Sequence, residues 1–421
     1  MKQHFFALLS FALGTGMLFA GEPGPVFSND VVQAVKDVVV VLQKHGLPFD
    51  ARKACDAAVD AVIQVADPRG QLMSDADIRR MTEEDKGIRY EAGIRVSLTN
   101  KTFVISEMRE GSEADKAGLR VGEVLQEIDK GNIEGLRLSE VQELLRGQAD
   151  QAVSVKVQDT NGVAREIEVK LDPVEAGAVG VAEELPANLC YLKLNGIYGR
   201  SGKDIVSLLR GWAETGRSGV VIDLRGAGGA DAQGVADTAG LFAESGSLLF
   251  AFRDAQDQDL GVYRSNSSLL LNIPAMVLID EETRGAAEVL AAALAGSTRG
   301  VMLIGSVSSG DPLVREVQEL PDGSHLYLAT RKLVVADGKS YNGSEGVKPD
   351  LVVAPAAAPD NEYEPEPPVD PVRELSSEEK EDRLLRDRVR GDETLRRAVD
   401  VLLGLKALNI RGVENAENPT H

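Results

Sequence analysis

The sequence predicts an α/β protein built around a mostly parallel sheet that helices cover on both faces. The first observation behind this prediction is an alternation of short apolar runs with helical patterns in the second half of the chain. The apolar runs lie at 190–194, 219–224, 275–279 and 301–305. The second observation is a strand-rich segment at 90–172, which predicts a smaller α+β domain between N-terminal helices and the main sheet.

The composition indicates a multidomain protein with an acidic surface. Its 421 residues suggest two or three domains, and 43% hydrophobic residues are enough for sizeable cores. The formal net charge of −21 argues against nucleic acid as a partner. The chain has four histidines, of which His4 and His421 lie at its ends. Very few histidines are therefore left to form a His-rich zinc site or a Ser-His-Asp triad. We therefore expect no metal or other cofactor.

The N-terminus has the features of a secretory signal. Lys2 precedes an apolar run over 5–20, and glutamate and proline residues follow at once. This pattern predicts removal of about residues 1–20, export to the periplasm or the exterior, and no membrane span in the mature protein. An uncleaved N-terminal anchor is the alternative. In an exported protein Cys55 and Cys190 could pair, but two isolated buried thiols are favoured.

Helices are expected at both ends of the chain. In the N-terminal helical region, 26–88, apolar residues recur at helical spacing in a first helix and again over 50–65. Near the C-terminus, an acidic, proline-rich linker at 355–375 precedes two charged helices within 376–410. The second of these carries a docking stripe formed by Leu395, Val399, Leu402, Leu403 and Leu405. The terminal helices are candidates for packing contacts or for a homodimer contact.

The segment 90–172 resembles a PDZ domain. The resemblance is carried by its Glu-Gly-Ser, Ala-Gly-Leu and Gly-Glu-Val-Leu motifs, which follow a predicted hairpin and precede a predicted helix at 138–146. In that fold a peptide C-terminus adds as a strand between the first strand and this helix, and backbone N–H groups hold its carboxylate. The resemblance implies a binding site formed by Ala92, Gly93, Ile94 and Arg95 in the loop and by Ser139, Gln142, Glu143 and Arg146 in the helix. The alternative is a PDZ unit that only packs against its neighbour.

The following segment, 173–354, resembles the core of the C-terminal processing (tail-specific) peptidases, serine enzymes of the ClpP/crotonase-like fold. Residues 223–229, Asp-Leu-Arg-Gly-Ala-Gly-Gly, match the family's Asp-Leu-Arg-Gly-Asn-Pro-Gly-Gly segment. The family's nucleophilic serine opens a helix, and its base is a lysine about 25 residues later. A serine hydroxyl needs such a base, and a lysine acts as one only when burial lowers its pKa.

The resemblance implies that this chain lacks the catalytic side chains. Gly285 stands at the serine position, Asp311 at the lysine position and Arg315 at the position of a glutamine that orients the lysine. Nearby hydroxyls could replace the serine, and the candidates are Thr283, Ser306, Ser308 and Ser309. No lysine lies between Lys203 and Lys332, however, and a carboxylate at 311 would be a poor base and would oppose an oxyanion.

The main-chain groups of the site are a separate question. The resemblance implies that the N–H groups of Gly229 and Ala286 form an oxyanion hole, which could hold a peptide without cleaving it. A tunnel that has filled in is the alternative. We therefore expect an exported, catalytically inactive homologue that binds peptide or protein C-termini. The alternatives are an active serine-type endopeptidase with a non-standard nucleophile or base, and an architectural, dimerising scaffold.

Overall fold

The computed structural model describes residues 29–408, apart from 47–49, 100–101, 137, 160, 200, 268–270, 272, 298–299, 322 and 354–375. The predicted signal and the acidic linker lie outside the described residues. Residues 1–72 and 73–421 form two compact units, which are described separately. Within the described part of the chain, every helix is too short or too polar to cross a bilayer.

The first unit contains the two expected N-terminal helices, α2 (Asn29–Lys44) and α3 (Ala51–Ala66). At the end of helix α3 the Asp67 amide donates a last helical hydrogen bond to the Ile63 carbonyl at 2.8 Å. The chain then turns, and the Gly70 amide donates to the Asp67 carbonyl at 2.9 Å. The side chain of Ile63 covers Gly70 so closely that a Cβ there would lie 2.6 Å from it. The glycine therefore lets the chain turn tightly against the helix end.

The second unit begins with helix α4 (Asp75–Asp85), which the sequence patterns did not single out. A capping box fixes its start, because Ser74 Oγ accepts from the Asp77 amide at 3.2 Å and the Asp77 carboxylate accepts from the Ser74 amide at 3.0 Å. The helix is polar and buries none of its residues completely. It contacts strand β2 (Ile88–Glu91), which leads into the predicted PDZ domain.

The predicted PDZ segment folds as a six-stranded antiparallel sheet with two short helices, α5 (Glu113–Lys116) and α6 (Leu138–Leu144). The sheet order is β3-β4-β5-β8-β9, formed by Ile94–Thr99, Thr102–Met108, Val124–Ile128, Ala152–Gln158 and Ala164–Lys170. The sixth strand, β6 (Gly131–Asn132), pairs with β5 outside this order. β2 leads into the domain and pairs antiparallel with β10 (Asp172–Glu175), which leads out. The domain is thus inserted on two adjacent strands, and its first strand, β3, is an edge strand.

The main domain is built on the expected, mostly parallel sheet. Its order is β11-β12-β14-β18-β19-β24, formed by Val179–Leu185, Leu189–Leu194, Gly219–Asp223, Ala275–Ile279, Val301–Gly305 and Leu351–Val352. All neighbours are parallel except β11 and β12. The strands predicted from apolar runs at 275–279 and 301–305 have the same limits as β18 and β19.

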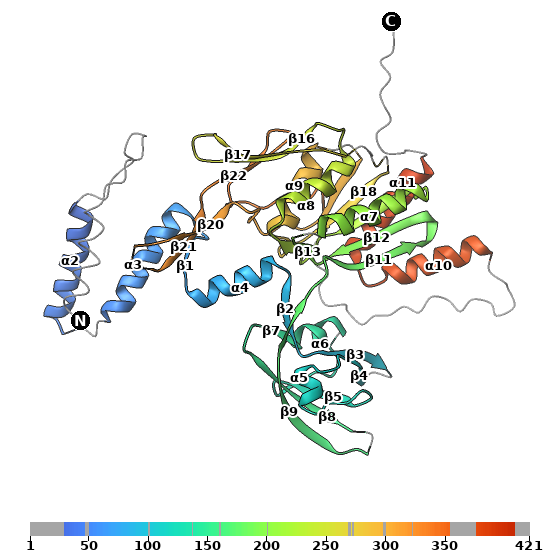
Figure 1. Cartoon of the computed structure of the whole chain (residues 1–421), viewed down its shortest axis with the longest axis horizontal. Helices are drawn as coiled ribbons and strands as arrows, with labels where there is room; N and C mark the ends of the chain where they lie inside the picture. Colours follow the sequence, from blue (N-terminus) through green and yellow to red (C-terminus); the bar gives the residue numbers. More distant parts are fainter. Residues whose placement is uncertain are drawn as a thin grey trace, which may run out of the picture. The chain divides into compact units, whose positions relative to one another are not determined.

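Alternate residues of the central strands enter two separate cores, as the two-residue period of a strand requires. Val220 and Ile222 of β14 face the core under α7 (Ser201–Glu214), α8 (Ala232–Ala239) and α9 (Gly285–Ser297). Val221, between them, faces the core under α10 (Ser377–Val389) and α11 (Glu393–Ala407). Figure 1 shows α8 and α9 on one side of the sheet and α10 and α11 on the other. The predicted coverage of both faces is confirmed.

The predicted docking stripe on α11 is also confirmed. Leu395, Val399 and Leu402 are buried against the sheet, and Leu403 and Leu405 are partly buried beside them. Leu402 lies so close to the start of β14 that a Cβ on Gly219 would be 2.7 Å from it. Because α11 contacts β14, β18 and β19, it covers the centre of the sheet rather than its edge.

A second, four-stranded sheet and a hairpin complete the main domain. The sheet order is β17-β16-β22-β23, formed by Asp259–Arg264, Leu248–Arg253, Lys332–Val335 and Ser340–Tyr341. The β16–β17 hairpin was not predicted. The hairpin of β20 (Arg315–Glu319) and β21 (His325–Ala329) turns over residues 320–324, as its proline- and glycine-containing turn predicted.

Candidate functional site

The site lies where strand β18 passes through a tight turn into helix α9. The turn is held by Asp280, whose carboxylate accepts from the Gly226 amide at 2.9 Å and the Glu282 amide at 3.2 Å. Residues 286–294 of helix α9 are all apolar except Glu288, and all of them are wholly inaccessible to solvent. The helix start is therefore fixed from both directions, by the turn and by the core.

Gly285 is the first residue of helix α9, directly after the turn, and we call this position the pivot. It is in close contact with residues 226–229, which we call the glycine loop. Its φ of +57° belongs to the left-handed region that favours glycine. The Gly229 carbonyl oxygen lies too close to Gly285 to leave room for the Cβ of any side chain at this position. A side chain at position 285 would therefore require the Gly229 backbone to move.

The three residues that the resemblance assigned to the family's catalytic positions, Gly285, Asp311 and Arg315, lie together. The Gly285 amide donates to the Asp311 carbonyl at 2.9 Å, so these two positions are in direct backbone contact. The Asp311 carboxylate accepts from the Tyr327 hydroxyl at 3.2 Å and lies 3.1 Å from Arg315 Nη1. The Arg315 side chain is buried, and its other terminal nitrogen donates to the Gly343 carbonyl at 2.9 Å. Asp311 thus lies in a partly buried ion pair with Arg315 and a hydrogen bond with Tyr327.

Two further ionisable groups, which the sequence analysis did not identify, share this environment. Burial raises the pKa of Tyr327, and the charge and hydrogen bond of Asp311 raise it further. Burial also raises the pKa of Asp85, at the end of α4, from 3.8 to about 6, with additional repulsion from Glu84 and Asp311. Asp85 comes from a segment far from the motif in sequence, so no local pattern could have placed it there.

Glu288, one turn into α9, holds the loop that carries Asp311. Its buried carboxylate accepts from the Ser308 hydroxyl and, at 2.7 Å each, from the amides of Gly310 and Asp311. Burial raises the pKa of Glu288, and these three hydrogen bonds oppose that rise. The backbone of the loop is therefore satisfied by a side chain of the helix that follows Gly285.

Of the hydroxyls considered as substitute nucleophiles, those of Thr283, Ser306 and Ser308 have structural partners. Thr283 is buried, and its hydroxyl bonds the Asp280 amide and lies 3.0 Å from the Leu224 carbonyl. The Ser308 hydroxyl bonds Glu288 and accepts from the Val347 amide at 2.7 Å. Ser306 donates to Glu281 at 2.8 Å, and Ser309 bonds the Thr283 carbonyl through its amide at 3.0 Å.

A charged network lies beneath the glycine loop. Asp223 is buried at the end of β14 and accepts from the Tyr191 hydroxyl at 2.8 Å. Its burial disfavours ionisation, but the hydrogen bond with Arg225 and the charges of Lys193 and Arg225 prevail and lower its pKa to about 2. Arg225 also bonds the two carboxylate oxygens of Asp392, the N-cap of α11, at 2.9 and 2.7 Å. The only lysine in this network is therefore held in an ion pair.

Strand β3 of the PDZ domain has one edge that no other described strand of its sheet covers. β3 pairs with β4 on one side, and its other side faces α6. Gly93 precedes β3 with a φ of +74°, and its carbonyl accepts from the Arg109 amide at 2.9 Å. Ala92 is buried and donates to the Leu145 carbonyl at 2.9 Å, whereas Arg95 is exposed and 3.5 Å from Glu107. The predicted loop therefore precedes the open edge of β3, and helix α6 lies beside the same strand.

One residue of the predicted helix wall lies elsewhere. Helix α6 ends at Leu144, and Arg146 lies in the short strand β7 (Arg146–Gly147), where it pairs with Glu91 of β2. Its placement in the helix was wrong because the chain turns into a strand as soon as Leu145 enters the core. Gln142 is half-buried on α6, and the side chains of Ser139 and Glu143 lie outside the described part of the structure. Cys190 is a free, buried thiol, as favoured from the sequence.

Comparisons with protein families assign the two domains. A model of peptidase family S41 matches residues 188–353, which include the glycine loop, Gly285, Asp311 and Arg315. A PDZ domain model matches residues 104–159.

Curated relatives are similar over most of the chain. The chain is 24% identical over 303 residues to the carboxy-terminal processing protease CtpA of Bacillus subtilis (strain 168), covering 72% of this chain and 64% of that protein. It is 26% identical over 332 residues to the chloroplastic carboxyl-terminal-processing peptidase 1 of Arabidopsis thaliana, covering 73% and 64%. The chain thus spans less than two thirds of the length of these relatives. A solved photosystem II D1 C-terminal processing protease is 23% identical, with a TM-score of 0.44 over 73% of this chain and 83% of that one.

Proposed function

We propose that this chain, which belongs to the C-terminal processing serine peptidase family and carries a PDZ domain, binds peptide or protein C-termini without cleaving them. The family membership and the fold inferred from sequence, a peptidase core with an inserted PDZ domain, are confirmed by these matches. The loss of catalysis and the retained binding are our proposal.

One observation carries the loss of catalysis. The Gly229 carbonyl leaves no room for a Cβ on Gly285, and Asp311 is the residue that the family resemblance assigns to the position of the base. The Asp311 carboxylate is engaged by Arg315 and Tyr327, which speaks against its taking a proton from a nearby hydroxyl. The partners of Thr283 and Ser308 speak against the alternative of an active endopeptidase with a rearranged nucleophile.

The open edge of β3 supports peptide binding. An extended peptide could pair with β3 through its main chain, while α6 forms the opposite wall. The left-handed Gly93 turns the chain just before this strand, as a carboxylate-binding loop requires. The amides of Gly229 and Ala286 could contribute a second holding point in the main domain, as the family resemblance implies.

The experiment measures cleavage and binding with one set of peptides. Fluorescent, unstructured peptides with a free C-terminal carboxylate should bind saturably and remain intact, and their C-terminal amides should bind about tenfold more weakly. Ile94→Asp, which puts a negative charge at the start of β3, should weaken binding, whereas Thr99→Asp at the exposed far end of the same strand should not. Cleavage that Thr283→Ala or Ser309→Ala abolishes would contradict the proposal, as would equal binding of acid and amide.

The N-terminal helices favour a second role, dimerisation. Helices α2 and α3 expose six valines, Val35, Val38, Val40, Val41, Val62 and Val65. Exposed valines in such number are unusual for a solvated helix pair, and a second copy of the chain would bury them. Sedimentation should therefore give a dimer for the wild type and a monomer for Val38→Asp with Val41→Asp. A wild-type monomer at micromolar concentration would contradict this role.

We also propose that the mature protein acts outside the cytoplasm, in the periplasm or as a secreted protein. Lys2 and the apolar run that follows it support this location. Cell fractionation together with N-terminal sequencing of the mature protein tests it, with cleavage near residue 20 as the expected result.

A further inference from the structure

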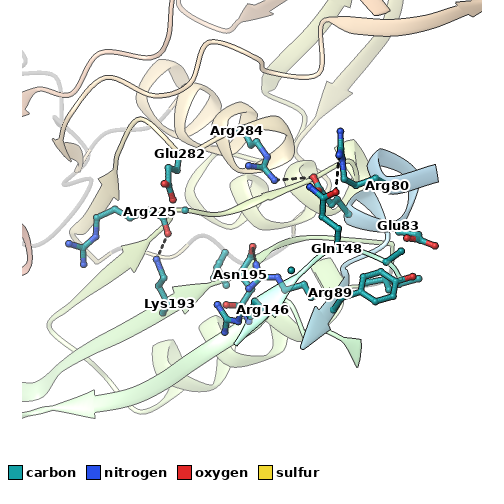
Figure 2. Close-up of a pocket in the computed structure, with 17 residues that line it drawn as sticks. Arg80, Glu83, Arg89, Arg146, Gln148, Lys193, Asn195, Arg225, Glu282 and Arg284 are labelled. Atoms are coloured by element: carbon teal, nitrogen blue, oxygen red, sulfur yellow. Dashed lines mark hydrogen bonds and ion pairs between the residues drawn. The ribbon is translucent and has the colours of Figure 1, made fainter. Parts of the chain in front are cut away.

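A polar cavity of about 580 Å³ lies in the second unit, between the main domain, helix α4 and the strands that carry the PDZ domain. It opens beside the glycine loop and the turn before Gly285, at the carboxyl ends of β12, β14 and β18. Ligands of α/β proteins commonly bind at such strand ends. Six basic residues from all three parts line the cavity, namely Arg80, Arg89, Arg146, Lys193, Arg225 and Arg284. Figure 2 shows that the Arg225 guanidinium points away from the other labelled residues. Only three acidic residues, Glu83, Glu84 and Glu282, line the same cavity.

Some of these basic groups are already neutralised within the protein. Lys193 and Arg225 share Asp223, and Arg225 also pairs with Asp392. Arg80 pairs with Asp77 at 2.7 Å on its own helix. These cations shape the wall of the cavity, but their charges are largely compensated.

Arg89 differs from the others. It is half-buried on β2, and its guanidinium donates to the Asn195 carbonyl at 3.3 Å. Among the residues that the structure describes, no carboxylate lies within ion-pair distance of Arg89. A partly buried guanidinium with only a neutral partner favours the binding of an anion.

Arg284 offers a second, exchangeable cation. It immediately precedes Gly285 and lies over the glycine loop, where a side chain on Gly228 would contact it at 3.6 Å. Its partner is Glu84 of α4, at 3.2 Å, and both side chains are more than half exposed. An exposed ion pair of this kind contributes little stability, so a ligand carboxylate can take the place of Glu84 at little cost.

We propose that this cavity binds a carboxylate-rich peptide segment, which Arg89 and Arg284 recognise and which displaces Glu84 from Arg284. The inference rests on the proposed function, since it assumes that the chain holds peptides intact, but it assigns a site distinct from the groove of β3 and α6. The acidic side chains of the peptide, rather than its C-terminal carboxylate, are the recognised groups. The net charge of −21 makes this selectivity notable, because the rest of the surface repels such a ligand.

The test separates the two sites with four peptides that differ in two features. Internal positions carry either Asp and Glu (acidic) or Asn and Gln (neutral), and the C-terminus is either a free carboxylate or an amide. The groove requires the free C-terminus, and the cavity requires the acidic side chains. The acidic amide should therefore bind the wild type at low salt, weaken as salt is added, and bind Ile94→Asp unchanged.

Variants of the cavity give the decisive comparison. Arg89→Gln should weaken the acidic amide about tenfold. Arg264→Gln is the matched control, because Arg264 also donates to a backbone carbonyl, that of Gly246 at 3.2 Å, on the distant strand β17. Glu84→Gln should strengthen binding about threefold by freeing Arg284. This gain cannot arise from misfolding, so the inference stays testable if Arg89→Gln is unstable.

Several outcomes would overturn the inference. Equal binding of the acidic and the neutral amide would remove the cavity as an acid-selective site, and so would unchanged affinity in both Arg89→Gln and Glu84→Gln. Equally tight binding of a sulfated polysaccharide would show a general anion surface instead. The neutral peptide with a free C-terminal carboxylate tests the groove by itself. If this peptide fails to bind while the acidic amide binds, the groove proposal fails and the cavity proposal stands.

Discussion

The carbonyl oxygen of Gly229 lies too close to Gly285 to leave room for a Cβ there. The two glycines come from different turns, one after β14 and one after β18. A Cβ on Gly285 would require the Gly229 backbone to move, and a Cβ on Gly229 would require the Ile197 backbone to move. The consequences extend to catalysis, to stability and to the surrounding ionisable groups.

Restoring the family's side chains should not restore cleavage. Gly285→Ser combined with Asp311→Lys places the hydroxyl against the Gly229 carbonyl and forces a serine to adopt a φ of +57°. We expect no cleavage of the reporter peptide and a loss of about 1–3 kcal/mol in the free energy of unfolding. Gly211→Ser is the control, because Gly211 lies on α7 with open space around it. Cleavage by the double variant would show that the loop can open.

Glu288→Gln should destabilise the main domain. The amide cannot accept all three hydrogen bonds of the carboxylate, so at least one buried amide of Gly310 or Asp311 loses its partner. The expected cost is about 2 kcal/mol. The fluorescence of Trp212, the only tryptophan and a part of the main core, reports unfolding of this domain in urea. Glu281→Gln, which removes a carboxylate that accepts from Ser306 at the surface, should shift the midpoint far less.

Asp85→Asn should change how stability depends on pH. Because the folded-state pKa of Asp85 is raised to about 6, the native protein holds this proton between pH 4 and pH 6, whereas the unfolded chain releases it. Wild-type stability therefore falls as the pH rises through this range. The variant should be more stable by ~1 kcal/mol at pH 7.5, with no advantage below pH 4. Asp400→Asn, an exposed change on α11, should show no such dependence, and parallel pH profiles of wild type and Asp85→Asn would refute the assignment.

Truncating the docking stripe of α11 should loosen the C-terminal helices. Leu402→Ala removes a buried side chain that packs on the start of β14 and should cost about 2–4 kcal/mol. Leu384→Ala on α10, where the side chain is 62% exposed, should cost less than about 0.5 kcal/mol. Trp212 fluorescence in urea measures the first effect, and faster proteolysis near residue 390 locates it. Equal midpoints for the two variants would mean that α11 does not stabilise the sheet.

The sequence alone predicted the elements whose signal is local. The apolar runs at 275–279 and 301–305 identified two strands, and the leucine spacing on α11 identified the docking face. The resemblance to the peptidase family assigned Gly285, Asp311 and Arg315 to one site, and these three residues lie together in the structure. Such predictions succeed because the period of apolar residues and the position of a glycine in a turn are properties of neighbouring residues.

Only the tertiary structure decided which distant groups meet. The approach of Gly229 to Gly285, the placement of Asp85 near Asp311 and the pairing of Arg225 with Asp392 join segments that no sequence period relates. The end of α6 before Arg146 was likewise set by a strand pairing with Glu91 and not by helical spacing. The physical reason is that proximity across the fold depends on how elements pack, and burial and charge, which fix the pKa values and the shape of the site, arise only after packing.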